Sequence, residues 1–456
     1  MRITNAFASA ALAAALSACV AGPDYAAPQN PAPERYSRAP GAEPAAPDLD
    51  GPWWTGFGAD GLDALIETAL SENLDIRQSA ERLAAAEALA GAARSDFLPT
   101  VDGGVEASVR SDGGDAASAG LTISQVIDVN GRLQRARERA RAEVLAAQYR
   151  LEDLRRLTAA SAAALYVDAR RARARLALLD ASLELQQRTL DIVERRAEAG
   201  LSADLDVRRA AADLARTRAQ RGALELQQAR ARNALSVLLG RAPGRGLEGL
   251  DPARETASDA LGLSYEPSIP VGAPADMIRR RPDLRAAEAR LMAATADIGV
   301  EQADLYPALR LPGAVTADLG EGPGEGLTAS LSAVLDVPLF DFGRRRADVT
   351  AAEARAVEAA LAYERAVLTA LEEVETGLVA IESVQARLSD LEIAVRESER
   401  AFDQLNALYR EGLASFIDVL DAQRTLIGSR EALVDSQADL AAAVIDLNVA
   451  LASPTR

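Results

Sequence analysis

The sequence predicts a mainly α-helical protein with a small β part, and three observations support this fold class. The 456-residue chain is 49% hydrophobic but only 4% aromatic, so alanine and leucine supply its apolar surface and favour close-packed helices. Residues 100–242 and 339–453 contain no proline, so large parts of both ranges can be continuous helix. Short motifs of the first half return in the second half in the same order, which indicates an internal duplication.

Residues 1–18 have the features of a lipoprotein signal peptide. Arg2 precedes an apolar stretch, Ala6 to Leu16, of about 11 residues, which is too short to span a bilayer as a stable helix. Cys19, the single cysteine of the chain, then follows Leu-Ser-Ala as in a bacterial lipobox. We expect cleavage before Cys19 and its acylation; an ordinary signal peptide that happens to contain a cysteine is the alternative. By resemblance, Val20 in the next position indicates the outer membrane.

Two proline-rich segments divide the mature chain. Eight of the 20 prolines lie between Pro23 and Pro52, which predicts an extended N-terminal arm over residues 19–59. Six more lie between Pro243 and Pro282, and they mark a linker over residues 241–275 between two repeats.

Each repeat has the same predicted order of a helix, a β-hairpin, a long helix and a shorter returning helix. In the long helix of the first repeat, apolar residues follow one another at helical steps of 3, 4, 7 and 11 residues. At about 1.5 Å per residue, that helix would be on the order of 100 Å long, so we expect an elongated molecule. The predicted elements are 60–96, 98–128, 131–199 and 201–239 in repeat 60–240, and 276–304, 307–339, 343–411 and 413–452 in repeat 276–456, which ends in a short C-terminal tail.

The duplication is visible in an ordered series of matches. Phe97-Leu98-Pro99 matches Leu305-Tyr306-Pro307 at an offset of 208 residues, and Gly200-Leu201 matches Gly412-Leu413 at an offset of 212. Chance agreement between alanine-rich helices explains single matches, but not a series interrupted at the same breaks.

The two hairpins show the alternation of half-exposed strands. Apolar or small residues occupy the odd positions from Val101 to Val109, and polar residues occupy most of the even ones. The same phase returns in the other three strands, each about ten residues long, which is enough to cross a bilayer at a tilt. A soluble hairpin packed on helices is the alternative. Four strands cannot close a membrane barrel, so the membrane interpretation requires several subunits to pool their strands.

Composition excludes several classes of function. The chain has 68 acidic and 50 basic residues, a net charge of −18, so it lacks the basic surplus of a nucleic-acid-binding protein. It has no histidine, which removes histidine catalysis and Cys/His zinc sites. We therefore expect no enzymatic activity, no cofactor and no metal site.

The pattern resembles the outer membrane factor (TolC) family, in the lipoprotein (NodT-type) branch that serves resistance-nodulation-division efflux pumps. The resemblance rests on Cys19 followed by Gly22-Pro23-Asp24-Tyr25, on Trp53-Trp54 ahead of the first helix, and on the duplicated order of elements. It also rests on Gly412-Leu413 followed by Phe416-Ile417-Asp418-Val419-Leu420-Asp421-Ala422-Gln423.

This resemblance implies a homotrimer whose twelve strands form one β-barrel in the outer membrane, continued by the helices as a periplasmic α-barrel. The linker 241–275 would lie in an equatorial ring around the helices. The protein would be lipid-anchored in the outer membrane, with an inner-membrane pump and a periplasmic adaptor as partners. It would carry drugs or other toxic small molecules from the periplasm to the exterior without chemistry.

The resemblance also implies two sets of site residues. The breaks between long and short helices would be adaptor-docking tips, although simple hairpin turns explain them equally well. Asp418 and Asp421 would place six carboxylates of a trimer at the periplasmic gate, with Tyr409 and Asp206 linking neighbouring helices. Ala414 occupies the place of the family's latch arginine, so Arg410 or Arg424 could substitute. The tip residues are Gly200, Leu201, Ser202, Gly412 and Leu413.

Two other functions remain open at the level of sequence. A channel for type I protein secretion has the same fold with a different inner partner, and the lipobox favours efflux over it. A structural coiled-coil lipoprotein without a pore belongs to a different class, and the four alternating strands argue against it.

Overall fold

The computed structural model describes residues 20–28, 33–38, 51–108, 116–244, 247, 263, 265, 269, 271–319 and 326–455. The predicted signal peptide, Cys19, most of the linker 241–275 and the end of the first predicted strand at Val109 lie outside the described residues. The elements in chain order are η1 (Trp53–Phe57), α2 (Asp60–Glu72), α3 (Leu74–Ser95), β1 (Thr100–Ser108), β2 (Ala116–Ile127), α4 (Arg132–Glu198), α5 (Asp204–Ala219), α6 (Arg221–Leu238), α7 (Pro274–Arg280), α8 (Pro282–Ala303), β3 (Ala308–Asp318), β4 (Leu327–Leu331), β5 (Val334–Asp336), α9 (Arg344–Arg410) and α10 (Phe416–Ala450).

Two compact units make up the chain, and each combines parts of both predicted repeats. Unit 1 contains Met1–Pro31, Ser79–Leu151 and Pro282–Leu368, and unit 2 contains Ala32–Gln78, Glu152–Arg281 and Thr369–Arg456. The long helices α4 and α9, of 67 residues each, contribute to both units and confirm the predicted long helices. Within the described ranges, none of the helices combines the length and the apolar character needed to cross a membrane.

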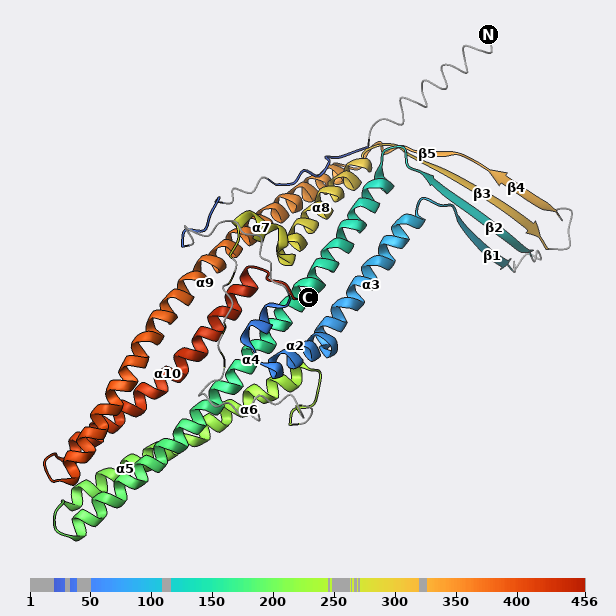
Figure 1. Ribbon diagram of the computed structural model, residues 1–456. Coiled ribbons are helices and arrows are strands. Elements are labelled where there is room, and N and C mark those ends of the chain that lie inside the picture. Colours follow the sequence, from blue (N-terminus) through green and yellow to red (C-terminus); the bar gives the residue numbers. More distant parts are fainter. Residues whose placement is uncertain are drawn as a thin grey trace. The chain divides into compact units, whose positions relative to one another are not determined.

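Unit 1 carries one antiparallel sheet at the end of its helices, in the strand order β1-β2-β3-β4 with β5 also paired to β3 (Figure 1). The register places apolar residues of the odd series opposite one another, for example Val101 opposite Ile123 and Leu121 opposite Val315. The predicted alternation is therefore confirmed. Its apolar face is exposed, because Val105 and Leu331 each have 80% of their surface accessible.

The fourth strand differs from the prediction because it is interrupted at Ser332 and Ala333, between β4 and β5. The interruption lies opposite Pro312 of β3, whose carbonyl accepts the Ser332 backbone N–H at 3.0 Å. Proline has no N–H with which to return a second ladder bond, so the pairing lapses there and resumes at Val334.

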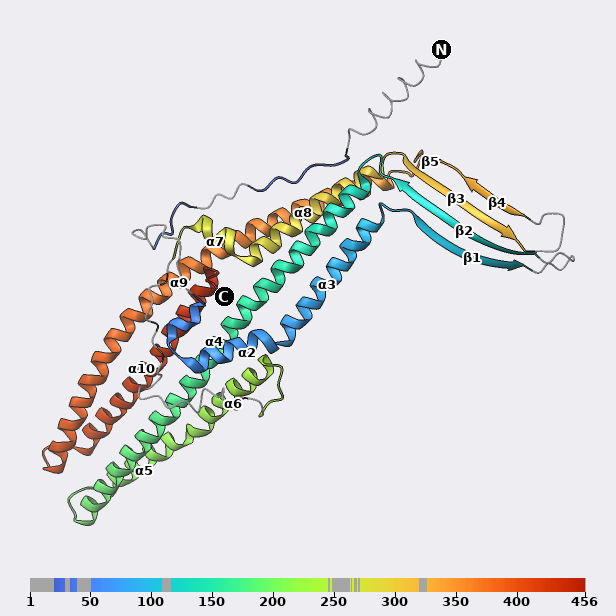
Figure 2. The same cartoon turned by 45° about the vertical axis from the view of Figure 1, so that its right-hand side comes forward.

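Unit 2 has a hydrophobic core around the aromatic residues of η1. Trp53 and Trp54 pack edge to face at 5.7 Å, and Trp53 and Phe57 at 6.4 Å. Side chains from α2, α4, α6 and α10 close around them, including Leu65, which is fully buried. In both views α10 lies beside α9, and α5 with α6 lies beside α4 (Figure 2).

Three predicted helices are each divided in two. The predicted helix 60–96 breaks at Asn73, 276–304 breaks at Arg281, and 201–239 breaks at Gln220. Pro282 explains the second break, because a residue before proline is held in the extended conformation that Arg281 adopts. At Gln220 the carbonyl accepts the Ala223 N–H at 3.2 Å, a 3₁₀-type bond that tightens the turn.

The break at Asn73 is made by its own side chain. Its Oδ1 accepts the backbone N–H groups of Asp75 and Ile76 at 2.9 and 3.0 Å, so it caps α3. Its Nδ2 donates to the Leu238 carbonyl at 2.8 Å at the end of α6. One buried amide therefore satisfies both helix termini.

We expect Asn73→Ala to destabilise unit 2 by about 1–2 kcal/mol, the usual cost of a lost cap, with a further cost for the Leu238 carbonyl. Thermal unfolding of the detergent-solubilised protein, followed by circular dichroism, measures this effect. Gln78→Ala changes an exposed amide of the same helix and is the control. Equal melting temperatures for the two variants would contradict the assigned role.

Candidate functional site

Both predicted tips are built by the same turn. Gly200 and Gly412 have φ of +71° and +77°, the left-handed conformation in which glycine carries no steric penalty. The Leu201 N–H reaches back to the Arg196 carbonyl at 2.7 Å, and the Leu413 N–H reaches the Leu408 carbonyl at 2.9 Å. These 6→1 bonds are typical of the Schellman motif, and the two leucines remain 66% and 75% exposed.

Asp418 and Asp421 lie on one exposed face in the first turns of α10. The Asp418 carboxylate has a structural task there, because its Oδ2 accepts the Ser415 backbone N–H at 3.2 Å and the Ser415 Oγ–H at 2.6 Å. Ser415 Oγ in turn accepts the Asp418 N–H, which completes a capping box. Asp418 therefore both caps the helix and presents a carboxylate to solvent.

Tyr409, at the end of α9, holds the first tip against the second. Its ring is buried, stacks under the Arg196 guanidinium at 4.8 Å and packs on Phe416 at 5.9 Å. Its hydroxyl bonds Ser202 Oγ at 3.1 Å. Asp206, the second predicted linking residue, instead pairs with Arg209 of its own helix at 3.6 Å. The structure thus places both residues in this region but gives them different partners.

A carboxylate that was not predicted from the sequence joins three helices nearby. Asp213 of α5 is 6% exposed at its side chain, and its Oδ1 accepts Arg424 Nε and Nη2 of α10 at 2.9 and 2.7 Å. Its Oδ2 accepts Gln186 Nε2 of α4 at 3.1 Å, and Arg216 of α5 lies 3.6 Å from Oδ1. We call Asp213, Gln186, Arg216 and Arg424 the Asp213 cluster.

Spacing contained a signal for this cluster. Asp213 follows Asp206 by two helical turns, so the two share a helix face. Arg424, a predicted substitute for the latch arginine, pairs with Asp213, which lies two helical turns further from the tip than Asp206. Arg410, the other predicted substitute, contributes through its backbone, because its carbonyl accepts a hydrogen bond from Arg196 Nη1 at 3.0 Å.

Further from the tips, two acidic residues of α10 form ion pairs with arginines of α4 and α9. Asp435 pairs with Arg171 and Arg175 of α4 at 2.9 and 3.5 Å, and Asp439 pairs with Arg387 of α9 at 2.5 Å. These side chains are partly exposed, so each pair contributes little alone. In the part of the chain that the structure describes, no group of three acidic or cysteine side chains is arranged to hold a metal ion.

The geometry therefore comprises two exposed tips, a capped acidic face and a buried carboxylate that ties two helical hairpins together. A family model described as outer membrane efflux protein matches residues 65–241 and 273–453. This chain belongs to the outer membrane efflux protein family. The matched ranges cover most of both repeats, so the predicted family resemblance is confirmed.

Relatives of this outer membrane efflux protein align over most of their own length. Nodulation protein T of Rhizobium leguminosarum bv. viciae is 32% identical, with 97% of this chain and 92% of the relative covered. The cation efflux system protein CusC of Escherichia coli strain K12 is 28% identical, with 93% and 94% covered.

Solved structures agree with this assignment. The outer-membrane channel OprN has a TM-score of 0.86 at 31% identity, with 96% of this chain and 100% of that chain covered. The structure of CusC has a TM-score of 0.81 at 26% identity, with 94% and 99% covered. The arrangement of long helices and short sheet in this efflux protein is therefore that of known outer-membrane channels.

Proposed function

We propose that this protein is the outer-membrane exit duct of a tripartite efflux system and exports toxic small molecules from the periplasm to the exterior. The family match over both repeats carries this conclusion. Similar proteins are named for the export of cations, pyoverdine and toluene. These relatives align with the same chain but are named for different cargoes, so in this proposal the duct provides the exit route and the inner-membrane pump selects the cargo.

The sheet supports a homotrimer with one shared barrel. Among the described residues, β1 pairs only with β2, and β4 pairs only with β3, so both outer strands have a free edge. Long apolar strands with free edges associate with other chains unless something covers them. Three copies joined edge to edge give twelve strands with one continuous apolar face toward lipid. Phe340 and Phe342, both fully exposed beside the strands, suit the interface of a membrane.

The tips support docking of a periplasmic adaptor, and an inner-membrane pump of the resistance-nodulation-division class would act through it. Leu201 and Leu413 project from two turns of equal geometry, so the adaptor meets two similar apolar sites in each protomer. Acylated Cys19 adds the lipid anchor. Several relatives are named as components of cation and solvent efflux systems, which favours this function over type I protein secretion.

Two measurements test the function. The purified protein should run as a heat-sensitive trimer on a gel and form ion channels in a planar bilayer. Deleting its gene, together with identifying a neighbouring pump and adaptor, should sensitise the cell to the compounds that this pump expels. A monomer without channel activity would support the structural-lipoprotein alternative.

Neutralising Asp418 and Asp421 should reduce the cation preference of the channel several-fold, because it removes the negative charge of six carboxylates from the narrow end of the trimer. Asparagine is the better substitute, since its side-chain oxygen preserves the capping box that alanine would destroy. Single-channel recordings of Asp418→Asn with Asp421→Asn measure the ratio of potassium to chloride permeability.

Asp403→Asn, an exposed acid of α9, is the matched control for these recordings. A permeability ratio of the double variant equal to that of wild type would rule out the constriction role of the two aspartates.

A further inference from the structure

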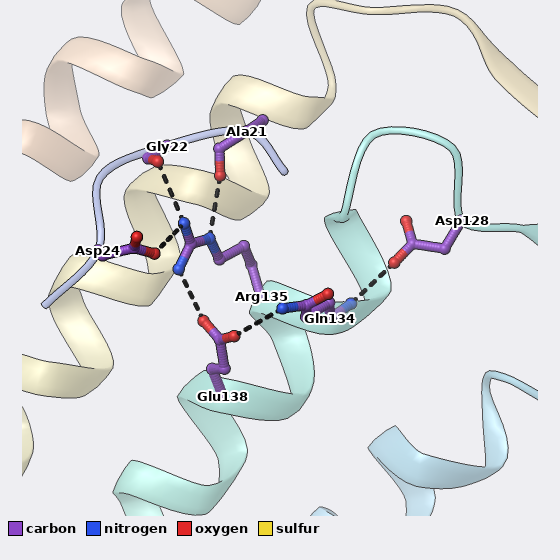
Figure 3. Close-up of polar contacts among 7 residues, drawn as sticks. All are labelled: Ala21, Gly22, Asp24, Asp128, Gln134, Arg135 and Glu138. Atoms are coloured by element: carbon purple, nitrogen blue, oxygen red, sulfur yellow. Dashed lines mark hydrogen bonds and ion pairs between the residues drawn. The ribbon is translucent and has the colours of Figure 1, made fainter. Parts of the chain in front are cut away.

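A buried guanidinium of unit 1 binds the N-terminal arm (Figure 3), in addition to the Tyr25 hydroxyl of the arm, which donates to Glu288 of α8 at 2.8 Å. Arg135, in the first turn of α4, is 6% exposed at its side chain, and its Nε donates to the Ala21 carbonyl at 3.0 Å. Its Nη2 donates to the Gly22 carbonyl at 3.1 Å and to Asp24 at 2.8 Å. Its Nη1 pairs with Glu138 at 2.8 Å. We call these contacts to residues 21–24 the arm clamp.

The arm also packs closely against the neighbouring backbone of unit 1. Gly22 has φ of +86°, and a Cβ there would lie 2.4 Å from the Gly299 Cα of α8. A Cβ on Gly299 would meet Arg135 Cγ at 2.6 Å and the Ala21 carbonyl at 2.8 Å. At Gly131, a Cβ would lie 2.6 Å from Val20 Cγ1. The arm and the helices therefore approach one another without room for one methyl group.

The docked arm lies where both hairpins join the helices of unit 1. The Ala21 N–H donates to the Asn130 carbonyl at 3.0 Å, between β2 and α4. Asn130 Nδ2 donates to the Pro307 carbonyl at 2.7 Å, between α8 and β3. If the strands enter the membrane, as the proposed function requires, residues 20–24 are docked at the membrane-proximal end of the helices.

Most of the stabilisation by the arm clamp comes from the hydrogen bonds between the Arg135 guanidinium and the backbone carbonyls of Ala21 and Gly22. Asp24 is 93% exposed at its side chain, so its charge is largely screened. Without the arm, Arg135 would keep Glu138 but lose its three bonds to residues 21–24, and a buried cation with unsatisfied donors is unfavourable. The planar fork of arginine matches two adjacent carbonyls, which lysine cannot reproduce.

We propose that Arg135 is a positioning residue for the membrane anchor. By docking residues 21–24 beside the hairpin junctions, it fixes the point at which the lipid-bearing N-terminus leaves the folded body. Successive Cα atoms are about 3.8 Å apart, so an acyl group on Cys19 starts within one residue of the docked Val20. The anchor is thereby held level with the base of the strands instead of at the end of a free tether. This inference rests on the proposed function.

Hydrogen exchange of the full-length, outer-membrane-inserted protein tests the clamp. In wild type, the peptide covering residues 20–28 should exchange slowly; Arg135→Ala should speed its exchange at least ten-fold, and Arg135→Lys should fall between them. Arg139→Ala is the matched control, because Arg139 lies one turn further along α4 and pairs with Asp297 of α8 rather than with the arm.

Gly22→Ala is the second variant, since it disturbs the arm and leaves the helices with all of their side chains. It should speed exchange as Arg135→Ala does. A bimane label on Ala27→Cys, whose thiol is the only free one once Cys19 is acylated, should be quenched more strongly by brominated lipids in both variants. Exchange and quenching equal to wild type in both variants would overturn the clamp.

Mass spectrometry of the N-terminal peptide separates this inference from the proposed function. A wild-type peptide without acyl mass would overturn the anchor role, whatever the efflux result. Failure of the proposed function would instead appear as a wild-type chain that forms no channel and restores no efflux, while its exchange pattern stays intact.

Discussion

Replacing Asp213 by alanine is expected to loosen the two helical hairpins from each other and to raise the open probability of the channel. The change removes the carboxylate shared by Arg424, Gln186 and Arg216 and leaves Gln186 buried without its acceptor. Breaking a fully buried ion pair costs about 3–5 kcal/mol. Arg424 is 47% exposed and can turn to solvent, so we expect a loss of about 1–3 kcal/mol.

A double-mutant cycle measures this coupling. Asp213→Ala, Arg424→Ala and the double variant are compared by thermal unfolding and by planar-bilayer recording. The second mutation should add little once the first is present, because both remove the same contact. Asp204→Ala is the control, since Asp204 pairs with Arg208 in its own helix and is exposed. Additive losses, or an unchanged open probability, would show that the cluster does not hold the hairpins together.

Trp53→Ala is expected to destabilise unit 2 by about 3–5 kcal/mol, the range for deleting a buried aromatic side chain. Trp53 is 2% exposed and makes edge-to-face contacts with both Trp54 and Phe57, so its removal opens a cavity in the centre of the core. Trp53→Phe should recover about half of the loss because it keeps one aromatic ring in the cluster.

Chemical denaturation in detergent, followed by the fluorescence of the remaining Trp54, measures the effect of Trp53→Ala. Val237→Ala, on the exposed face of α6, should change stability by less than about 0.5 kcal/mol and provides the baseline. A loss for Trp53→Ala as small as that of Val237→Ala would contradict the role of η1 as the centre of the core.

The long elements were predictable from the sequence because their causes are local. Absence of proline predicted α4, α9 and α10, regular apolar spacing supported α4, and alternation predicted the strands and their phase. Gly200 and Gly412 indicated both tips in the sequence, because glycine readily adopts the left-handed conformation that ends a helix at a tight turn.

The break at Asn73 and the ion pair of Asp213 were not predicted, because the partners that hold them are distant in sequence. Asn73 bonds Leu238, and Asp213 bonds Arg424, across more than a hundred residues in each case. Asparagine and aspartate within a helical pattern usually face solvent, so their types alone do not indicate a cap or a buried pair. The family resemblance pointed to Asp206 as a link between neighbouring helices, and the structure adds a contact of Asp213 with Arg424 two turns further along α5.

The bends at Asn73 and Arg281 occupy equivalent positions of the duplication, 208 residues apart. Their backbones agree closely, with φ and ψ of −56° and 129° at Asn73 and −62° and 116° at Arg281. One copy makes the bend with a side-chain cap, and the other makes it with the ring of Pro282. Two different local chemistries therefore give the backbone the same course, a side-chain amide in one repeat and a pyrrolidine ring in the other.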